Sequence, residues 1–217
     1  MTAPTESTEP GVGAAVDSAA ARHLLSAGND RLMATIDSSE NPDEVRAAFA
    51  KANPYAVVLG CADSRVPPEV VFDEPPGRLF VVRVASAVAG PNEIGSIEYA
   101  IARWACPLIV VLGHTECGGV AASLDKLPPN ADPQPDPTGW MHLSSLVFSI
   151  RSAIGDTSQC AACPDPWREA VELNVRKTVD ILQNWSEPIR RRVTAGELQV
   201  VGAVYDVKTG KVEFLDR

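Results

Sequence analysis

Three continuous apolar runs of strand length constrain the fold more than any other feature of this chain. They are YAVVLG (55–60), LFVVRVA (79–85) and PLIVVLG (107–113). A strand that is apolar at every position is buried on both faces, which is typical of a parallel sheet covered by helices. Between the second and third runs, EIGSIEYAIARW (93–104) places its isoleucines at helical spacing. The pattern therefore predicts an α/β fold with a mostly parallel central sheet.

The remaining segments supply further helices and a closing hairpin. Helices are expected at about 19–34, 45–51, 140–154 and 165–194. The last segment, LQVVGAVYDVKTGKVEFLD, is typical of an apolar strand, a turn at 208–210 and an amphipathic edge strand. The expected sheet therefore has four parallel strands and one antiparallel edge strand, and helices flank it.

Composition and charge restrict the class of protein. Residues 1–18 are rich in Thr, Pro, Glu, Gly and Ala and are expected to form a disordered tail, whereas 19–217 are expected to fold as one domain. The net charge of -9 disfavours a nucleic-acid-binding protein. We find no secretory signal and no apolar run long enough to span a membrane, so the expected location is the cytoplasm.

Two of the apolar runs are followed by residues that can bind a metal, together with one arginine. Cys61, Asp63 and Arg65 follow the first run, and His114 and Cys117 follow the third. Because ligands of open α/β sheets bind at the carboxyl ends of the strands, these side chains are expected to meet at one edge. Two cysteines and one histidine suit Zn²⁺ in a tetrahedral site with a fourth position open for chemistry. Five cysteines at irregular spacing do not indicate a disulfide framework.

Asp63 and Arg65 stand at alternate positions from Cys61, so that all three side chains can share one face of an extended turn. Arg65 can hold the Asp63 carboxylate bidentately and keep it ionised. Asp63 can then act as a fourth zinc ligand, or accept a hydrogen bond from a zinc-bound water and orient it. A closed structural zinc site with Asp63 as its fourth ligand is the alternative to a catalytic one.

Four segments together resemble one enzyme family. CADSRVPPEVVFD, FVVRVA, GSIEYAI and LIVVLGHTECGGV, in this order and spacing, resemble the β-class carbonic anhydrases. The resemblance runs from about Ala27 to the closing hairpin. It implies that Cys61, His114 and Cys117 bind one Zn²⁺ per subunit, and that Asp63 and Arg65 orient the fourth ligand.

The resemblance also implies a substrate pocket and an assembly. Gly118 would offer its backbone N–H near bound bicarbonate. Phe80 and Tyr99 fall where the family places aromatic residues in the pocket, part of which the partner subunit supplies. The expected assembly is a homodimer or a dimer of dimers.

The implied reaction is the reversible hydration of CO2 to bicarbonate by a zinc-bound hydroxide. Two departures from the family pattern leave alternatives open. Ala52 stands where the family commonly has a Gln that binds bicarbonate, and Ser86-Ala87 stands where it usually has Gly-Asn. One alternative is a hydrolase that acts on carbon disulfide or carbonyl sulfide at the same site. The other is a non-catalytic zinc-binding relative.

The other cysteines and histidines carry weaker expectations. Cys160 and Cys163, in CAAC, are interpreted as loop thiols or an incidental disulfide. Cys106 is expected in the core and His23 on the surface. His142 is a minor candidate for a proton shuttle.

Overall fold

The computed structural model describes residues 17–124, 141–155 and 165–216. Contacts divide the chain into two units, Met1–Ala50 and Lys51–Arg217. The expectation of one domain over 19–217 stays a prediction. Most of the tail expected at 1–18 lies outside the described residues, as do Cys160 and Cys163.

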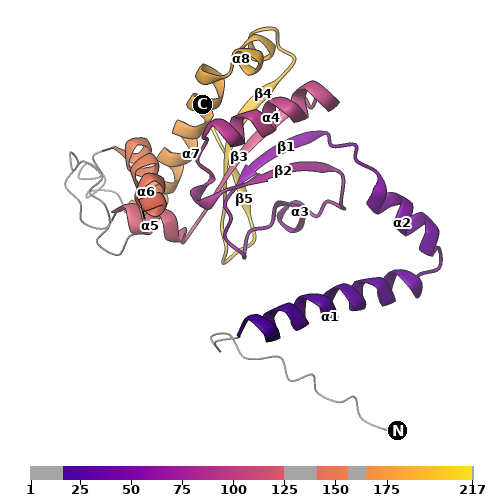
Figure 1. Ribbon diagram of the computed structural model, residues 1–217. Helices are drawn as coiled ribbons and strands as arrows, with labels where there is room; N and C mark the ends of the chain where they lie inside the picture. The colour runs from indigo at the N-terminus through magenta and orange to yellow at the C-terminus, as the bar shows by residue number, and fades with distance from the viewer. Residues whose placement is uncertain (1–16, 125–140, 156–164, 217) are drawn as a thin grey trace. The chain divides into compact units, whose positions relative to one another are not determined.

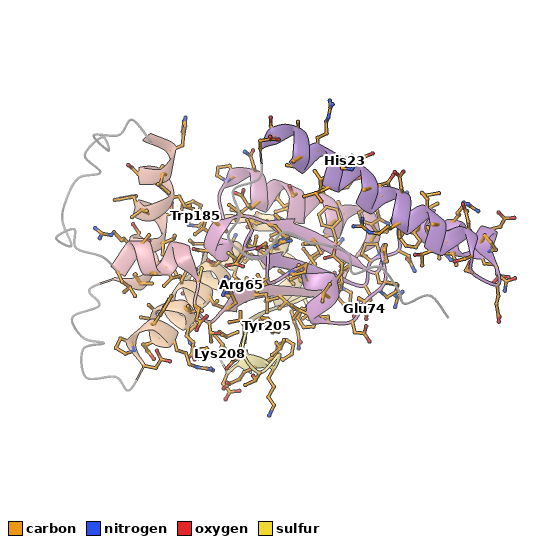
Figure 2. All side chains as sticks on the ribbon, turned by 90° about the horizontal axis from the view of Figure 1, so that it is seen from below. His23, Arg65, Glu74, Trp185, Tyr205 and Lys208 are labelled. Atoms are coloured by element: carbon orange, nitrogen blue, oxygen red, sulfur yellow. The ribbon has the colours of Figure 1, made fainter. Side chains whose placement is uncertain are left out.

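The first unit contains two helices, α1 (Ser18–Asp37) and α2 (Pro42–Ala50). The Asp17 side chain caps α1, because it accepts a hydrogen bond of 2.8 Å from the Ala20 N–H. Both helices are a few residues longer than the sequence pattern indicated. His23 is exposed on α1, as expected (Figure 2).

The second unit is built around one sheet with the strand order β2-β1-β3-β4-β5 (Figure 1). Its strands are β1 (Ala56–Gly60), β2 (Leu79–Arg83), β3 (Leu108–His114), β4 (Gln199–Tyr205) and β5 (Val212–Leu215). The first four run parallel and β5 pairs antiparallel with β4. Every residue of β1 is buried, which explains its continuous apolar sequence. The predicted fold class is confirmed.

Helices lie on the sheet and around the carboxyl ends of its strands. They are α3 (Pro68–Val71), α4 (Pro91–Trp104), α5 (Gly118–Leu124), α6 (Met141–Ile154), α7 (Pro166–Trp185) and α8 (Glu187–Thr194). A short 3-10 turn, η1 (Ala85–Ala87), follows β2. In the described part of the chain, none of the helices has the length and apolar character needed to cross a bilayer.

The single helix expected at 165–194 is wrong, because the chain breaks into α7 and α8 at Ser186. Ser186 has an extended backbone (φ -108, ψ 109), and its side chain accepts a hydrogen bond from the Ile189 N–H. Pro188 in the first turn of α8 has no N–H to continue the α7 ladder. A serine cap followed by a proline is therefore the signal that separates the two helices.

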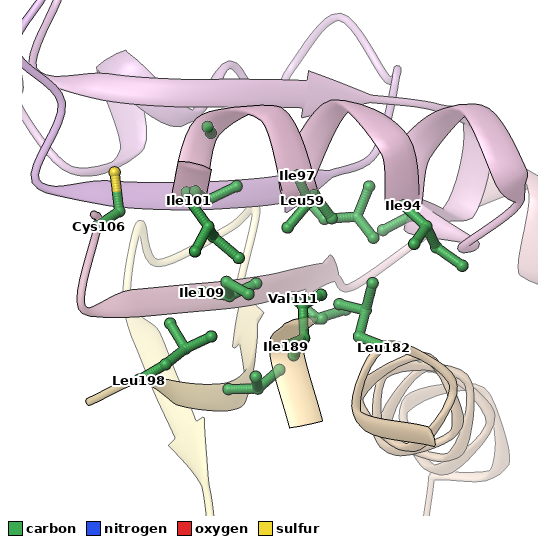
Figure 3. Close-up of a cluster of buried hydrophobic side chains, with 14 of the residues drawn as sticks. Leu59, Ile94, Ile97, Ile101, Cys106, Ile109, Val111, Leu182, Ile189 and Leu198 are labelled. Carbon is green, nitrogen blue, oxygen red and sulfur yellow. The ribbon is translucent and has the colours of Figure 1, made fainter. Parts of the chain in front are cut away.

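The main core lies between the sheet and helices α4, α7 and α8 (Figure 3). Ile97 and Ile101 of α4 pack over Leu59 of β1 and Ile109 of β3, and all four are at most 2% exposed. The helical spacing of the α4 isoleucines is thus the spacing of its buried face. Cys106 belongs to the same core at 1% exposure, as expected.

Two glycines let α7 approach the sheet closely. A Cβ atom at Gly113 would lie 2.6 Å from Cγ2 of Val175, and one at Gly202 would lie 2.7 Å from Cγ1 of the same valine. Val175 is completely buried. Gly113 directly precedes His114, so this close approach lies next to the end of β3.

We expect Gly202→Ala to lower the free energy of unfolding by about 1–3 kcal/mol, because the added methyl group overpacks the contact with Val175. Val175→Ala removes the clashing methyl groups, so the double variant should lose less than the sum of the two single losses. Urea unfolding of the four proteins measures this coupling. Additive losses would contradict the packing of α7 on Gly202.

Candidate metal centre

Cys61, His114 and Cys117 meet at the carboxyl ends of two neighbouring strands. Cys61 follows β1 and His114 ends β3, and these strands pair in register with Gly60 opposite Leu112. Their ligand atoms and that of Cys117 lie within 4.8 Å of one another. The three residues are 4%, 1% and 3% exposed, respectively. Three side chains that could ligate a metal thus lie together in the buried interior.

The His114 ring is oriented for metal binding. Its Nδ1 lies 2.8 Å from the Thr115 carbonyl oxygen, which can only accept, so Nδ1 carries the proton and donates. Nε2 therefore presents a lone pair, and this buried atom has no hydrogen-bond partner. Leaving a buried polar atom unpaired is costly, and a metal ion would satisfy it.

The two thiols are electrostatically coupled. The hydrogen bond from Cys61 lowers the pKa of the Cys117 thiol, and the contact with Ser86 lowers it further. The same contact with Cys117, together with burial, raises the pKa of Cys61. A divalent cation bound between the two sulfur atoms would favour the deprotonated form of both. Two thiolates and one imidazole nitrogen form a donor set that fits Zn²⁺.

The structure brings Asp63 and Arg65 together beside this cluster. The Arg65 N–H and Nε donate to Asp63 Oδ1 at 2.9 and 3.0 Å, and Nη2 donates to Oδ2 at 2.8 Å. These hydrogen bonds hold the pKa of Asp63 far below its usual range. Asp63 Oδ2 lies 4.0 Å from His114 Nε2, so an ionised carboxylate faces the open side of the cluster.

Sequence reasoning missed several residues that support this dyad. Arg83 Nε donates to the Cys61 carbonyl oxygen at 2.9 Å, and its Nη2 donates to the Asp63 carbonyl oxygen. Arg83 is the single charged residue in the second apolar run, and this was the signal for it.

Glu116 supports Arg65 from the other side. Its Oε2 lies 3.5 Å from Arg65 Nη1, and its Oε1 lies 2.7 Å from Nζ of Lys208 on the closing hairpin. Figure 2 labels Arg65 and Lys208 close to one another in the view. Nothing in the sequence signalled this link, because it joins segments that meet only in the folded sheet.

Phe80 and Tyr99 do not line the metal centre within one chain. They form an aromatic cluster with Trp104, with ring centroids 5.7 to 6.2 Å apart. Phe80 pairs with Val57 near the start of β1, whereas Cys61 follows the end of that strand. A role for these two aromatic residues in a partner's pocket stays a prediction.

The remaining predicted residues differ in their distance from the centre. Gly118 begins α5 directly after Cys117 and is thus next to the metal ligands. Ala52 is exposed before the start of β1, at the opposite end of that strand from Cys61. His142 is exposed in the first turn of α6, and its role as a proton shuttle stays a prediction.

We expect Arg65→Gln to raise the pKa of Asp63 towards the ordinary carboxyl value of about 4. A depressed native pKa contributes stability that is present above about pH 4 and lost as the pH falls towards that native value. The stability difference between parent and variant should therefore be largest above about pH 4 and shrink below it. Urea unfolding of the metal-free proteins between about pH 3 and 7 measures this, with the Asp63 carboxyl titration followed by NMR.

Arg78→Gln is the matched control. Arg78 also pairs with a carboxylate, Glu74 at 3.8 Å, but does not contact the cluster. It should leave the Asp63 titration unchanged. A pH-independent difference between the parent and Arg65→Gln would contradict the proposed pairing.

Comparisons with known proteins agree with this geometry. The carbonic anhydrase family model matches residues 56–212 of the chain. Carbonic anhydrase 2 of Mycobacterium tuberculosis is 34% identical over 205 residues, which are 91% of this chain and 92% of that protein.

Solved structures share the fold. The β-carbonic anhydrase CcaA superposes with a TM-score of 0.74 at 24% identity, over 90% of this chain and 95% of that chain. A β-carbonic anhydrase of Sordaria macrospora, described as tetrameric, has a TM-score of 0.72 at 23% identity, over 90% of this chain and 96% of that chain. From the family match, the identity to the mycobacterial enzyme and the shared fold, we conclude that the chain belongs to the β-class carbonic anhydrase family.

Proposed function

We propose that this protein catalyses the reversible hydration of CO2 to bicarbonate with one Zn²⁺ per chain, bound by Cys61, His114 and Cys117. The observation that carries the proposal is the unpaired, buried Nε2 of His114 within a cluster of two thiols, facing an ionised Asp63. Family membership and the printed name of the mycobacterial relative support CO2 as the substrate.

The metal and the dyad have separate roles in this proposal. Zn²⁺ held by the three ligands would lower the pKa of a bound water to about 7, for which carbonic anhydrase is the established example. Asp63 would select and orient the water or hydroxide that lies beside the cluster. Because it is ionised, it can only accept hydrogen bonds, so it favours an oxygen that carries a proton and turns that proton away from CO2.

The pairing with Arg65 favours this orienting role for Asp63 over direct metal ligation. Both carboxylate oxygens accept hydrogen bonds from Arg65, which in turn contacts Glu116. To ligate the metal, Asp63 would have to give up part of a bidentate ion pair. Arg65 thus holds Asp63 ready to accept a hydrogen bond and keeps it charged.

Neither alternative function gains support. The three relatives described above are named as carbonic anhydrases, and none of their names refers to carbon disulfide or carbonyl sulfide. A purely structural zinc site would not require an ionised carboxylate on its open side. We therefore retain CO2 hydration alone.

We also propose that the protein is a homo-oligomer. Tyr99 is 57% exposed although its ring packs against Phe80 and Trp104, so the cluster presents apolar surface to solvent in a single chain. The tetrameric description of the Sordaria macrospora relative supports this proposal. The expected cytoplasmic location stays a prediction.

Stopped-flow CO2 hydration by the zinc-loaded protein tests the function. We expect Asp63→Ala to lower kcat/KM by about 10- to 100-fold while zinc content is unchanged, because the orienting acceptor is lost and the ligands remain. Asp180→Ala, at an exposed position on α7, is the matched control and should retain parental activity. Negligible turnover by the zinc-loaded parent between about pH 6 and 9 would refute the proposed function.

A further inference from the structure

Ser86 occupies a backbone conformation that serine rarely adopts. It lies in η1 with φ 60 and ψ 14, in the left-handed region, and is only 3% exposed. A residue other than glycine is strained in this region. Such a conformation persists only where surrounding contacts hold it. The contacts of Ser86 therefore indicate what holds it.

Each of the three polar groups of Ser86 has a buried partner. Its N–H donates to Cys61 Sγ at 3.2 Å, and its hydroxyl lies 3.4 Å from Cys117 Sγ. Its carbonyl oxygen accepts a hydrogen bond of 2.7 Å from Nδ2 of Asn174, which is 2% exposed on α7. The helix thus anchors the carbonyl, while the other two groups point at the two sulfur atoms.

The neighbouring helix leaves room for the hydroxyl. A Cβ atom at Gly119 would lie 2.3 Å from the Ser86 oxygen, which is too close for any ordinary contact. Gly119 on α5 is therefore required by the serine side chain itself. This gives a second, independent way to disturb the hydroxyl.

We propose that Ser86 is a positioning residue that fixes both cysteine sulfurs of the zinc centre through one backbone and one side-chain hydrogen bond. The inference rests on the zinc site of the proposed function. A metal-bound thiolate carries no proton, so the hydroxyl must be the donor to Cys117. Both hydrogen bonds stabilise the deprotonated form of the sulfurs and restrict their direction, which favours metal binding at neutral pH.

Zinc affinity gives a test that does not depend on catalysis. Chelator competition with purified full-length protein should show the zinc dissociation constant rising by about tenfold or more in both Ser86→Ala and Ser86→Gly. The glycine variant suits a positive φ, so its loss of affinity would not arise from a rebuilt backbone. Ser123→Ala is the matched control, because Ser123 is also buried but donates to the Gly119 carbonyl oxygen at 2.8 Å and touches neither sulfur. It should bind zinc as the parent does.

Gly119→Ala extends the test to a second residue. It should weaken zinc binding in the parent, because the methyl group displaces the Ser86 hydroxyl, and should have no further effect in the Ser86→Gly background. In the Co²⁺-substituted protein, loss of the hydrogen bond should shift the thiolate-to-cobalt charge-transfer band to lower energy, because the sulfur lone pairs are less stabilised. This band reports on the thiolates directly.

Unchanged zinc affinity in both Ser86 variants would overturn the proposal, as would an equal loss in Ser123→Ala. An unshifted cobalt band would also overturn it. None of these measurements uses CO2, so their failure is distinguishable from a failure of the proposed function.

Discussion

The parallel, in-register pairing of β1 with β2 and β3 is the constraint on which the rest of the structure depends. It aligns Gly60 with Arg83 on one side and with Leu112 on the other. The residues that follow these three positions therefore meet at one edge, although they are far apart in the chain. Cys61 comes from β1, Ser86 from the turn after β2, and His114 from β3. The metal centre follows directly from the pairing.

Electrostatics explains why cationic side chains surround this edge. Two sulfurs and the Asp63 carboxylate bring negative charge into a largely buried space, and burying unpaired charge is costly. Arg65 pairs with the carboxylate, and Arg83 donates to the backbone carbonyl oxygens of Cys61 and of Asp63 itself. A divalent cation bound by the cluster would complete the balance of charge. The polar residues here thus act as one network, in which a change at one member alters the others.

The meeting of Cys61, His114 and Cys117 and the pairing of Asp63 with Arg65 could be predicted from the sequence, because each depends on strand ends and short spacings. The apolar runs predict parallel strands whose carboxyl ends meet at one edge of the sheet. The motifs C-x-D-x-R and H-x-x-C place cysteine, aspartate and histidine at those strand ends. Ser86 and Glu116 could not be predicted, because their contacts depend on left-handed backbone at φ 60 and φ 58 and on segments that pack only after folding. The break between α7 and α8 at Ser186 could have been predicted, because a capping serine followed by Pro188 is a local signal for a new helix.

The coupling between metal site and fold runs in both directions. Cys61 and His114 come from separate strands. Gly113, next to His114, lies against Val175 of α7, and Asn174 of the same helix donates a hydrogen bond to the Ser86 carbonyl oxygen. Packing of α7 on the sheet therefore helps to position both His114 and Ser86, which contacts the sulfur atoms of Cys61 and Cys117. A metal that binds only this arrangement stabilises it by mass action, since the unfolded chain cannot bring the same donors together. The strained backbone at Ser86 is tolerated because α7 packing and sulfur contacts hold it together.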